Sequence, residues 1–400
     1  MQRKGTDIDP HILAWRKVPR ELYDASYVAS GDQHFFSHQL MNGKYEETFL
    51  FDTIAWSVFA HRLKVNTSLP FAKKGKKRSQ QRFVRLGVIE GGLNVEETEG
   101  QELTVDSPNG AVRPVCTPDE FREWARVFLA QVGLLIEQGA DIILAGEFGC
   151  PTVENDAHFT TFEEDLRALL KSAERPIFVV AGSRHTPAPQ DVAEKGYPFN
   201  ENVALVFGGD PTVEGAEKAF EDQPIPHKKR SAAIRIRERL MSPMGEDMMS
   251  YKTPFGIIGV LICSDAFDSR ILFSYLRENV DAHDRTQLIL VPSYNKSPLF
   301  FDSCRYLSYL ANTTVVVLNS KDDGFPEETV RVFVCGFDYR EISHCLDKVF
   351  KDEGFNGRQR QEFIQSVKRD QPLADGQDDA KARQTAGYLL AYGALHEFSK

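Results

Sequence analysis

The stretch YKTPFGIIGVLICSDAFD, residues 251–268, decides the fold class. Its centre, residues 256–262, is an unbroken apolar run rather than an alternation of apolar and polar positions. A strand with this composition has both faces covered, which is the arrangement of layered α/β proteins. The run closes at Cys263, where an acidic turn begins. We therefore predict a buried strand over residues 256–263 that exposes a thiol at its end.

Apolar runs of the same kind recur between residues 82 and 345, separated by segments with helical periodicity. The predicted strands are RFVRLGVIEGG (82–92), DIILAGE (141–147), PIFVVAG (176–182), NVALVFGG (202–209), QLILVPS (287–293), TTVVVLNS (313–320) and VRVFVCGF (330–337). Further helices are expected around residues 162–173, 271–278 and 303–312. The alternation predicts one large α/β domain over residues 82–345.

The clearest helix start lies at Thr117. Thr117 is a typical N-cap, Pro118 suits the first helical position, and Glu120 three residues after the cap completes a capping box. Gly139 provides the C-terminal stop. The apolar positions of this helix, at helical spacing, are Phe121, Trp124, Phe128, Val132 and Leu135.

Two extensions flank the predicted domain. Residues 1–81 are aromatic-rich and irregular, and their last part belongs to a basic run, AKKGKKRSQQR (72–82), that reaches the first predicted strand. A solvated linker is the plainer interpretation of this run, with contact to nucleic acid or an acidic partner as the alternative. Residues 346–400 are expected to be a helical C-terminal extension, in which the apolar segment GYLLAYGAL (387–395) docks on the body or on a second subunit.

Composition narrows the function classes. The 400-residue chain has a net charge of -10, which argues against nucleic acid as a main partner because phosphate binding needs a basic surface. Its six cysteines are dispersed and form no CxxC pair, so neither a zinc ribbon nor a thioredoxin motif is expected. Neither a signal peptide nor a membrane span is recognisable. These features predict a cytoplasmic protein that handles small molecules.

Three residues lie where the chemistry of an α/β protein is usually found. Glu147 and Cys263 each close a predicted strand, and side chains at the carboxyl ends of strands face the ligand crevice. Lys229 lies between them in PIPHKKRSAA. Taken singly, each has a plainer explanation: a solvated Glu, a small buried thiol and a solvated basic run. Their order along the chain and their local sequences carry the functional hypothesis.

Four segments resemble the nitrilase superfamily, in which Glu, Lys and Cys follow one another in this order. They are ADIILAGEFGCP (140–151), FNENVALVF (199–207), the core PFG-x-x-G-x-x-x-C-x-D within residues 254–265, and QLILVPSYN (287–295). The segment that contains Cys263 is highly specific, whereas PIPHKKRSAA, which contains Lys229, is a weak match. The resemblance covers roughly residues 82–345.

The resemblance implies an α-β-β-α sandwich that commonly dimerises into a larger layered assembly. It also implies hydrolysis of a non-peptide carbon–nitrogen bond (amide, nitrile or N-carbamoyl) through a cysteine thioester. Cys263 would be the nucleophile and Glu147 the base, while Lys229 and the backbone N–H of Ser264 would hold the oxyanion. Neither a metal nor an organic cofactor is implied. The expected partners are a small-molecule substrate and a second copy of the chain, as a homodimer or higher oligomer.

The sequence also departs from the family pattern. Ser264 stands where an aromatic residue usually follows the cysteine, and Asp268 and Ser269 stand where a Pro-Glu pair is common. Lys228 adjoins Lys229 and is the alternative catalytic lysine. A second glutamate often follows the lysine in the family, and both Glu238 and Glu246 could fill that role.

The sequence is also compatible with other functions. A nitrilase-like protein could be catalytically silent and act as a binding or regulatory module, or it could be an acyltransferase in which an amine captures the thioester. A thiol peptidase would need a Cys/His pair, with His158, His185 and His227 as candidates. The basic run leaves a nucleic-acid-associated accessory protein as a further possibility.

Overall fold

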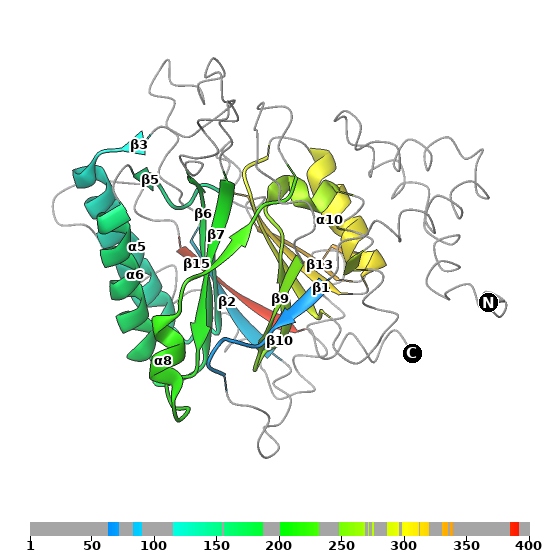
Figure 1. The fold of residues 1–400 in the computed structure, drawn as a ribbon. Coiled ribbons are helices and arrows are strands. Elements are labelled where there is room, and N and C mark those ends of the chain that lie inside the picture. Colours follow the sequence, from blue (N-terminus) through cyan, green and yellow to red (C-terminus); the bar gives the residue numbers. More distant parts are fainter. Residues whose placement is uncertain are drawn as a thin grey trace, which may run out of the picture.

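The protein is a mixed α/β structure, as predicted (Figure 1). The computed structural model describes residues 63–71, 83–89, 115–153, 156–186, 201–231, 248–268, 271, 274–275, 286–295, 298–311, 313–319, 330–334, 337–338 and 385–391. Within these residues, none of the helices is long and apolar enough to cross a membrane.

Two large sheets organise the chain. The seven-stranded sheet has the order β1 (Leu63–Asn66), β9 (Met248–Thr253), β10 (Gly256–Val260), β11 (Leu288–Ser293), β12 (Thr314–Asn319), β13 (Val330–Val334), β14 (Phe337–Asp338). The six-stranded sheet has the order β15 (Thr385–Ala391), β2 (Phe83–Ile89), β4 (Ile142–Ala145), β6 (Ile177–Thr186), β7 (Glu201–Gly209), β8 (Ile225–Lys228). A two-stranded ribbon pairs β3 (Val115–Cys116) with β5 (Thr152–Val153).

The helical elements lie among the strands in sequence. They are α5 (Pro118–Glu137), α6 (Asp156–Lys171), α8 (Ala216–Glu221), α10 (Pro298–Leu310) and the 3-10 helix η3 (Cys263–Phe267). The central strands of each sheet run parallel: β2, β4 and β6 in one, and β10, β11 and β12 in the other. Their carboxyl ends therefore lie at a common edge of each sheet, where polar side chains can meet.

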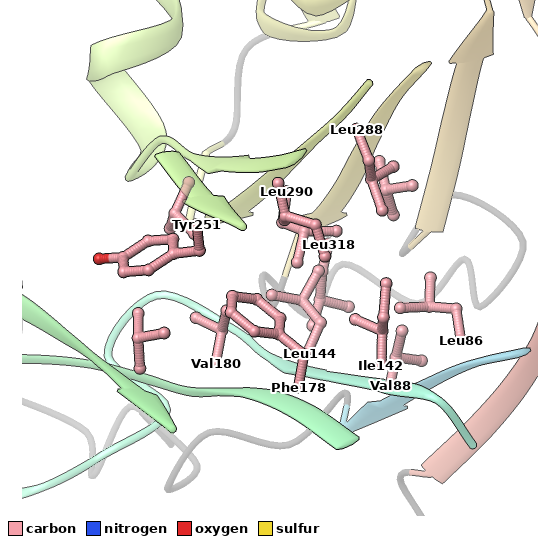
Figure 2. Packing of buried hydrophobic residues seen from close by; sticks show 14 of the residues in the cluster. Leu86, Val88, Ile142, Leu144, Phe178, Val180, Tyr251, Leu288, Leu290 and Leu318 are labelled. Carbon is pink, nitrogen blue, oxygen red and sulfur yellow. The ribbon is translucent and has the colours of Figure 1, made fainter. Parts of the chain in front are cut away.

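The packing explains why strands β4 and β11 are apolar on both faces. In β4, Ile142 and Leu144 pack between the two sheets, whereas Ile143 and Ala145 pack with the helices α5 and α6. In β11, Leu288 and Leu290 pack between the sheets, whereas Ile289 and Val291 pack on the opposite face with α10. Figure 2 shows the apolar layer between the sheets, with side chains from both meeting there. β4 and β11 thus bury both faces.

Helix α5 begins as the sequence predicts. Thr117 accepts a hydrogen bond from the Glu120 N–H at 3.3 Å, and the Glu120 carboxylate accepts one from the Thr117 N–H at 2.7 Å. This is the predicted capping box, with Pro118 in the first turn. Gly139 follows the helix with a φ of +87°, a conformation that glycine adopts without strain.

The folded body begins earlier in the chain than residue 82, where the sequence predicts its start. β1 lies inside the segment predicted as an irregular extension, and it pairs in parallel with β9. Leu69 is buried between the sheets, and the Pro70 carbonyl accepts a hydrogen bond from the Asp210 N–H. Residues 63–71 therefore belong to the body. The basic run at 72–82 lies outside the described residues.

The predicted helical C-terminal extension is wrong over residues 385–391. These residues form β15, which pairs antiparallel with β2 from Thr385 opposite Ile89 to Ala391 opposite Phe83. The physical reason is that β2 offers an edge whose backbone groups need partners, and β15 supplies them. The other residues of the extension, and most of the predicted helix at 271–278, lie outside the described residues.

Candidate active site

The structure brings Glu147, Lys229 and Cys263 together. Glu147 follows β4 and Lys229 follows β8 in the six-stranded sheet, whereas Cys263 follows β10 in the seven-stranded sheet. The Lys229 ammonium lies 2.7 Å from the Glu147 carboxylate, and both charged groups shift the pKa of the Cys263 thiol, which Glu147 raises and Lys229 lowers. All three side chains are buried. The site is therefore assembled from strand ends of both sheets.

Both carboxylate oxygens of Glu147 have fixed partners. Oε1 accepts hydrogen bonds from Lys229 Nζ at 2.7 Å and from Asn202 Nδ2 at 3.2 Å. Oε2 accepts one from the backbone N–H of Tyr294 at 2.8 Å. A carboxylate held through both oxygens cannot rotate freely, so its orientation in the site is fixed.

The turn that carries Glu147 depends on close backbone packing. A Cβ on Gly149 would lie 2.8 Å from the Gly146 carbonyl oxygen, and one on Gly182 would lie 2.9 Å from the same atom. Phe148 has a φ of +56°, a conformation uncommon for a bulky residue. Its ring packs against His185, with ring centroids 5.0 Å apart. Tight glycine contacts and this strained residue together turn the chain sharply after Glu147.

The two adjacent lysines are placed differently. The Lys229 side chain is fully buried against Glu147, and its backbone N–H donates to the Asn202 carbonyl at 2.8 Å. The Lys228 ammonium instead pairs with Glu201 at 2.8 Å, and 30% of its side chain is exposed. Successive residues of an extended strand point to opposite sides, which separates the two. Lys229 is therefore the lysine at the candidate site.

Cys263 stands at a sharp turn, with a φ of +45°. The sequence predicted an exposed thiol, but only 3% of Cys263 is exposed, because the turn after the strand lies between the two sheets. Burial raises the pKa of this thiol well above its ordinary value, and the Glu147 charge raises it further, whereas Lys229 lowers it. The resting thiol is thus protonated at neutral pH, with a carboxylate in reach to accept the proton.

Several residues that hold the side chains of the site in place lie within the predicted strands and motifs, but the sequence does not mark them as site residues. Asn295 Nδ2 lies 3.7 Å from Cys263 Sγ. Asn319, at the end of β12, holds Asn295 by accepting its backbone N–H at 2.9 Å and donating to its carbonyl at 2.9 Å. Asn202 and the Tyr294 N–H hold Glu147, as described above. Each lies within a strand or at most two residues after one, and that position is the only sequence signal for it.

Ser264 follows the cysteine within η3 and is buried. The family resemblance leads to a bulky residue at this position, and the chain has a small hydroxyl residue instead. The Ser264 hydroxyl donates to the Ser231 carbonyl and so bonds to the segment after Lys229. Asp268 accepts a hydrogen bond from the Ser231 hydroxyl at 2.6 Å. Ser269, Glu238 and Glu246 lie outside the described residues.

The histidines considered for a thiol peptidase have other surroundings. The groups that shift the pKa of the Cys263 thiol besides burial are Glu147, Lys229 and the Tyr294 N–H, and none is a histidine. His227 faces the Tyr251 hydroxyl at 3.0 Å, and burial lowers its pKa to about 4. Among the residues that the structure describes, no group of three or more His, Cys, Asp or Glu side chains is arranged to hold a metal ion.

Comparison with known proteins gives matches only among solved structures. No family model matches the chain, and no curated protein matches it in sequence. The structures that it resembles include Saccharomyces cerevisiae Nit3, described as a member of branch 10 of the nitrilase superfamily, at 14% identity over 64% of this chain and 83% of that one, with a TM-score of 0.40.

A second similar structure is an amidase of the nitrilase superfamily from Nesterenkonia, at 13% identity over 64% of this chain and 84% of that one, with a TM-score of 0.41. A third is the Caenorhabditis elegans NitFhit protein, at 14% identity over 64% of this chain and 56% of that one, with a TM-score of 0.39. The solved structures to which the chain is similar thus include nitrilase-superfamily proteins.

Proposed function

We propose that the chain is a carbon–nitrogen hydrolase of the nitrilase type, with an α-β-β-α sandwich as its catalytic domain. It cleaves a non-peptide carbon–nitrogen bond of a small amide, nitrile or N-carbamoyl compound through a thioester on Cys263. One observation carries the proposal: a buried carboxylate, Glu147, holds the Lys229 ammonium at 2.7 Å, and both charged groups act on the buried Cys263 thiol, whose pKa they shift in opposite directions. The four-segment sequence resemblance supports it independently.

For an amide, the first half-reaction begins with proton transfer from the Cys263 thiol to Glu147. The thiol is protonated at rest because burial raises its pKa, so a base within reach is needed to form the nucleophile. Sulfur then attacks the carbonyl carbon, a C–S bond forms, and the C–O π electrons move onto oxygen. Lys229 and the Ser264 N–H are proposed to stabilise that oxyanion.

Collapse of this intermediate breaks the C–N bond. The nitrogen leaves with the proton held by Glu147, which gives ammonia or an amine and leaves an acyl thioester on Cys263. In the second half-reaction Glu147 takes a proton from water as the water oxygen attacks the thioester carbon. The C–S bond then breaks, the proton returns to sulfur, and a carboxylic acid is released. No cofactor takes part in this sequence.

The test is a screen of amides, nitriles and N-carbamoyl compounds for ammonia release by the full chain. Cys263→Ala, Glu147→Gln and Lys229→Ala should each abolish turnover, because each removes a group used in both half-reactions. Lys228→Ala is the matched control: it removes the neighbouring lysine, which pairs with Glu201 away from the site, and should keep activity.

Intact-protein mass spectrometry after rapid quench adds a direct readout. An acyl adduct should form on the wild type and on neither Cys263→Ala nor Glu147→Gln. A chain that binds ligands equally well with and without the Cys263 thiol, and that never releases ammonia or forms an adduct across the panel, is a binding or regulatory protein instead. An adduct that only added amines discharge identifies an acyltransferase.

We also propose a homodimer or higher oligomer in the cytoplasm, on the basis of the sequence resemblance. Residues 387–391 of the apolar segment GYLLAYGAL give no support to this assembly, because their backbone pairs with β2 of the same chain. Light scattering at micromolar concentration should give at least twice the 45.2 kDa chain mass. A mass equal to that of one chain contradicts the proposed assembly.

A further inference from the structure

Two segments of the candidate site are joined by hydrogen bonds that the proposed chemistry does not use. The lysine segment, residues 229–231, begins with Lys229. The cysteine turn, residues 262–268, contains Cys263. The two segments come from different sheets, so nothing in either sheet's own hydrogen bonding fixes their separation. Asp265, which is 1% exposed, lies where they meet.

The Asp265 carboxylate bonds to the backbone of both segments. Its Oδ1 accepts the N–H of Arg230 at 2.8 Å and the N–H of Ser231 at 2.7 Å. Its Oδ2 accepts the N–H of Ile262 at 3.1 Å. The carboxylate therefore spans from the residues directly after Lys229 to the residue directly before the nucleophile.

Two further bonds cross the same junction. The Ser264 hydroxyl donates to the Ser231 carbonyl, and the Ser231 hydroxyl donates to the Asp268 carboxylate at 2.6 Å. Ser231 and Ser264 are both buried, so water competes little for these bonds. A buried network of this kind, with its members bonded to one another, holds a defined geometry.

We propose that Asp265 is a positioning residue of the site, whose carboxylate holds the lysine segment against the cysteine turn and so fixes the Lys229 ammonium relative to the Cys263 thiol. Asp265 acts through Lys229 and does not touch the reacting sulfur in this role. The catalytic consequence rests on the proposed function. The geometric consequence, the distance between ammonium and thiol, can be measured without any substrate.

The ionisation of Cys263 reports this distance. Lys229 lowers the pKa of the thiol, against burial and the Glu147 charge, which raise it. When the lysine segment is released, the ammonium moves away from the sulfur, the thiol ionises at higher pH, and its reaction with an electrophile at neutral pH slows. Loss of the Asp265 negative charge alone would have the opposite sign, because removing a nearby anion favours the thiolate.

The experiment is iodoacetamide labelling of the full chain, with Cys263 followed by peptide mass spectrometry from about pH 6 to pH 10. Asp265→Asn keeps the shape but loses acceptor capacity at the junction, and it should label about tenfold more slowly at neutral pH, which corresponds to one pKa unit. Asp268→Asn is the matched control from the same turn. Its amide oxygen can still accept from the Ser231 hydroxyl, so its profile should match the wild type. Cys150, buried elsewhere, serves as the reference thiol.

Melting temperature establishes that each variant is folded. An unchanged labelling profile in folded Asp265→Asn overturns the proposal, and faster labelling overturns it in favour of a charge effect alone. If Asp265→Asn does not fold, Ser264→Ala decides: it removes a bond across the same junction, and a smaller shift in the same direction supports the proposal while no shift overturns it. Labelling needs no turnover, so a chain that hydrolyses nothing would refute the proposed function and still test Asp265.

Discussion

At the scale of single residues, the Glu147–Lys229 ion pair places two charged side chains in the interior of the fold. Both side chains are almost completely removed from water. Breaking such a pair by removing one partner leaves a buried charge uncompensated, which typically costs about 3–5 kcal/mol. Lys229→Met should therefore lower the free energy of unfolding by about that amount, as measured by urea denaturation.

The neighbouring pair provides the control for that measurement. Lys228 and Glu201 form an ion pair of similar length with more solvent access, and such a pair contributes at most about 1 kcal/mol. Lys228→Met should have this smaller effect. The double variant Glu147→Leu with Lys229→Met should recover much of the stability lost in the single variant, because neither charge then stays buried alone. Equal losses for Lys228→Met and Lys229→Met contradict the buried pair.

The raised pKa of Asp265 predicts that the free energy of unfolding depends on pH. Burial raises its pKa to about 7, although Lys229 and the backbone N–H groups act in the opposite direction. In the unfolded chain the group titrates near a pKa of about 3.9. The folded state thus binds the proton more tightly. Its contribution to stability is fully present below about pH 3.9 and is lost as the pH rises to about 7.

Asp265→Asn has no proton to lose, so it isolates this contribution. The unfolding free energy of the wild type, relative to the Asn variant, should fall between about pH 4 and pH 7 and stay level above that range. Urea denaturation of both proteins across this range gives the difference directly. A difference that is constant with pH shows that the carboxylate is ionised throughout, with its N–H donors outweighing burial.

At the scale of elements, helix α5 shows how much a local signal can determine. Its capping box, its proline in the first turn and its glycine stop all lie within the sequence of the helix itself, and the structure contains all three. Thr117→Ala should cost about 1 kcal/mol of unfolding free energy, since it removes the side-chain acceptor for the Glu120 N–H. Thr161→Ala, at an exposed position inside α6, is the control and should be neutral or slightly stabilising. Equal effects of the two substitutions contradict the role of the cap.

The central strands were predictable for a related reason. β2, β4, β6, β7, β10, β11 and β12 are apolar on both faces, which is a property of their own residues. β1 and β15 were missed because they pair with strands distant in the chain, β9 and β2 respectively. β8, β9 and the two-residue strands β3 and β5 were missed as well. β8 is four residues long with a proline inside it, and β15 was assigned to a helix because an apolar segment has no inherent preference between the two states.

The residues of the candidate site also fall into two groups, those that the sequence identifies and those that only the folded structure reveals. Glu147, Lys229 and Cys263 could be identified because residue type, order and position at strand ends coincide. Asn202, Tyr294 and Asp265 could not, because their contribution is a hydrogen bond to a residue between 34 and 147 positions away. Tyr294 contributes through its backbone N–H alone, so its side-chain identity carries no signal at all. The geometry of the site is a property of the folded pair of sheets rather than of any segment.

At the scale of the whole molecule, the site depends on how the two sheets sit against each other. Glu147 and Lys229 extend from one sheet and Cys263 from the other, so the apolar layer between the sheets (Figure 2) sets the distance between Glu147 and Cys263. This predicts that cavities of similar size have different effects on activity according to which side of a sheet they lie on.

Adjacent residues of β11 test this prediction. Leu290 is fully buried between the sheets, whereas Ile289 is fully buried on the other face, with α10. Each change to Ala removes a similar volume from the same strand and should cost about 2–5 kcal/mol of unfolding free energy. A cavity at Leu290 lets the sheets shift relative to each other, and a displacement of about 1 Å between reacting groups can slow catalysis about 10²-fold. Leu290→Ala should therefore slow both iodoacetamide labelling of Cys263 and ammonia release well beyond Ile289→Ala, measured at a temperature where both variants are folded. Equal rates per folded molecule would show that each sheet holds its part of the site independently of the layer between them.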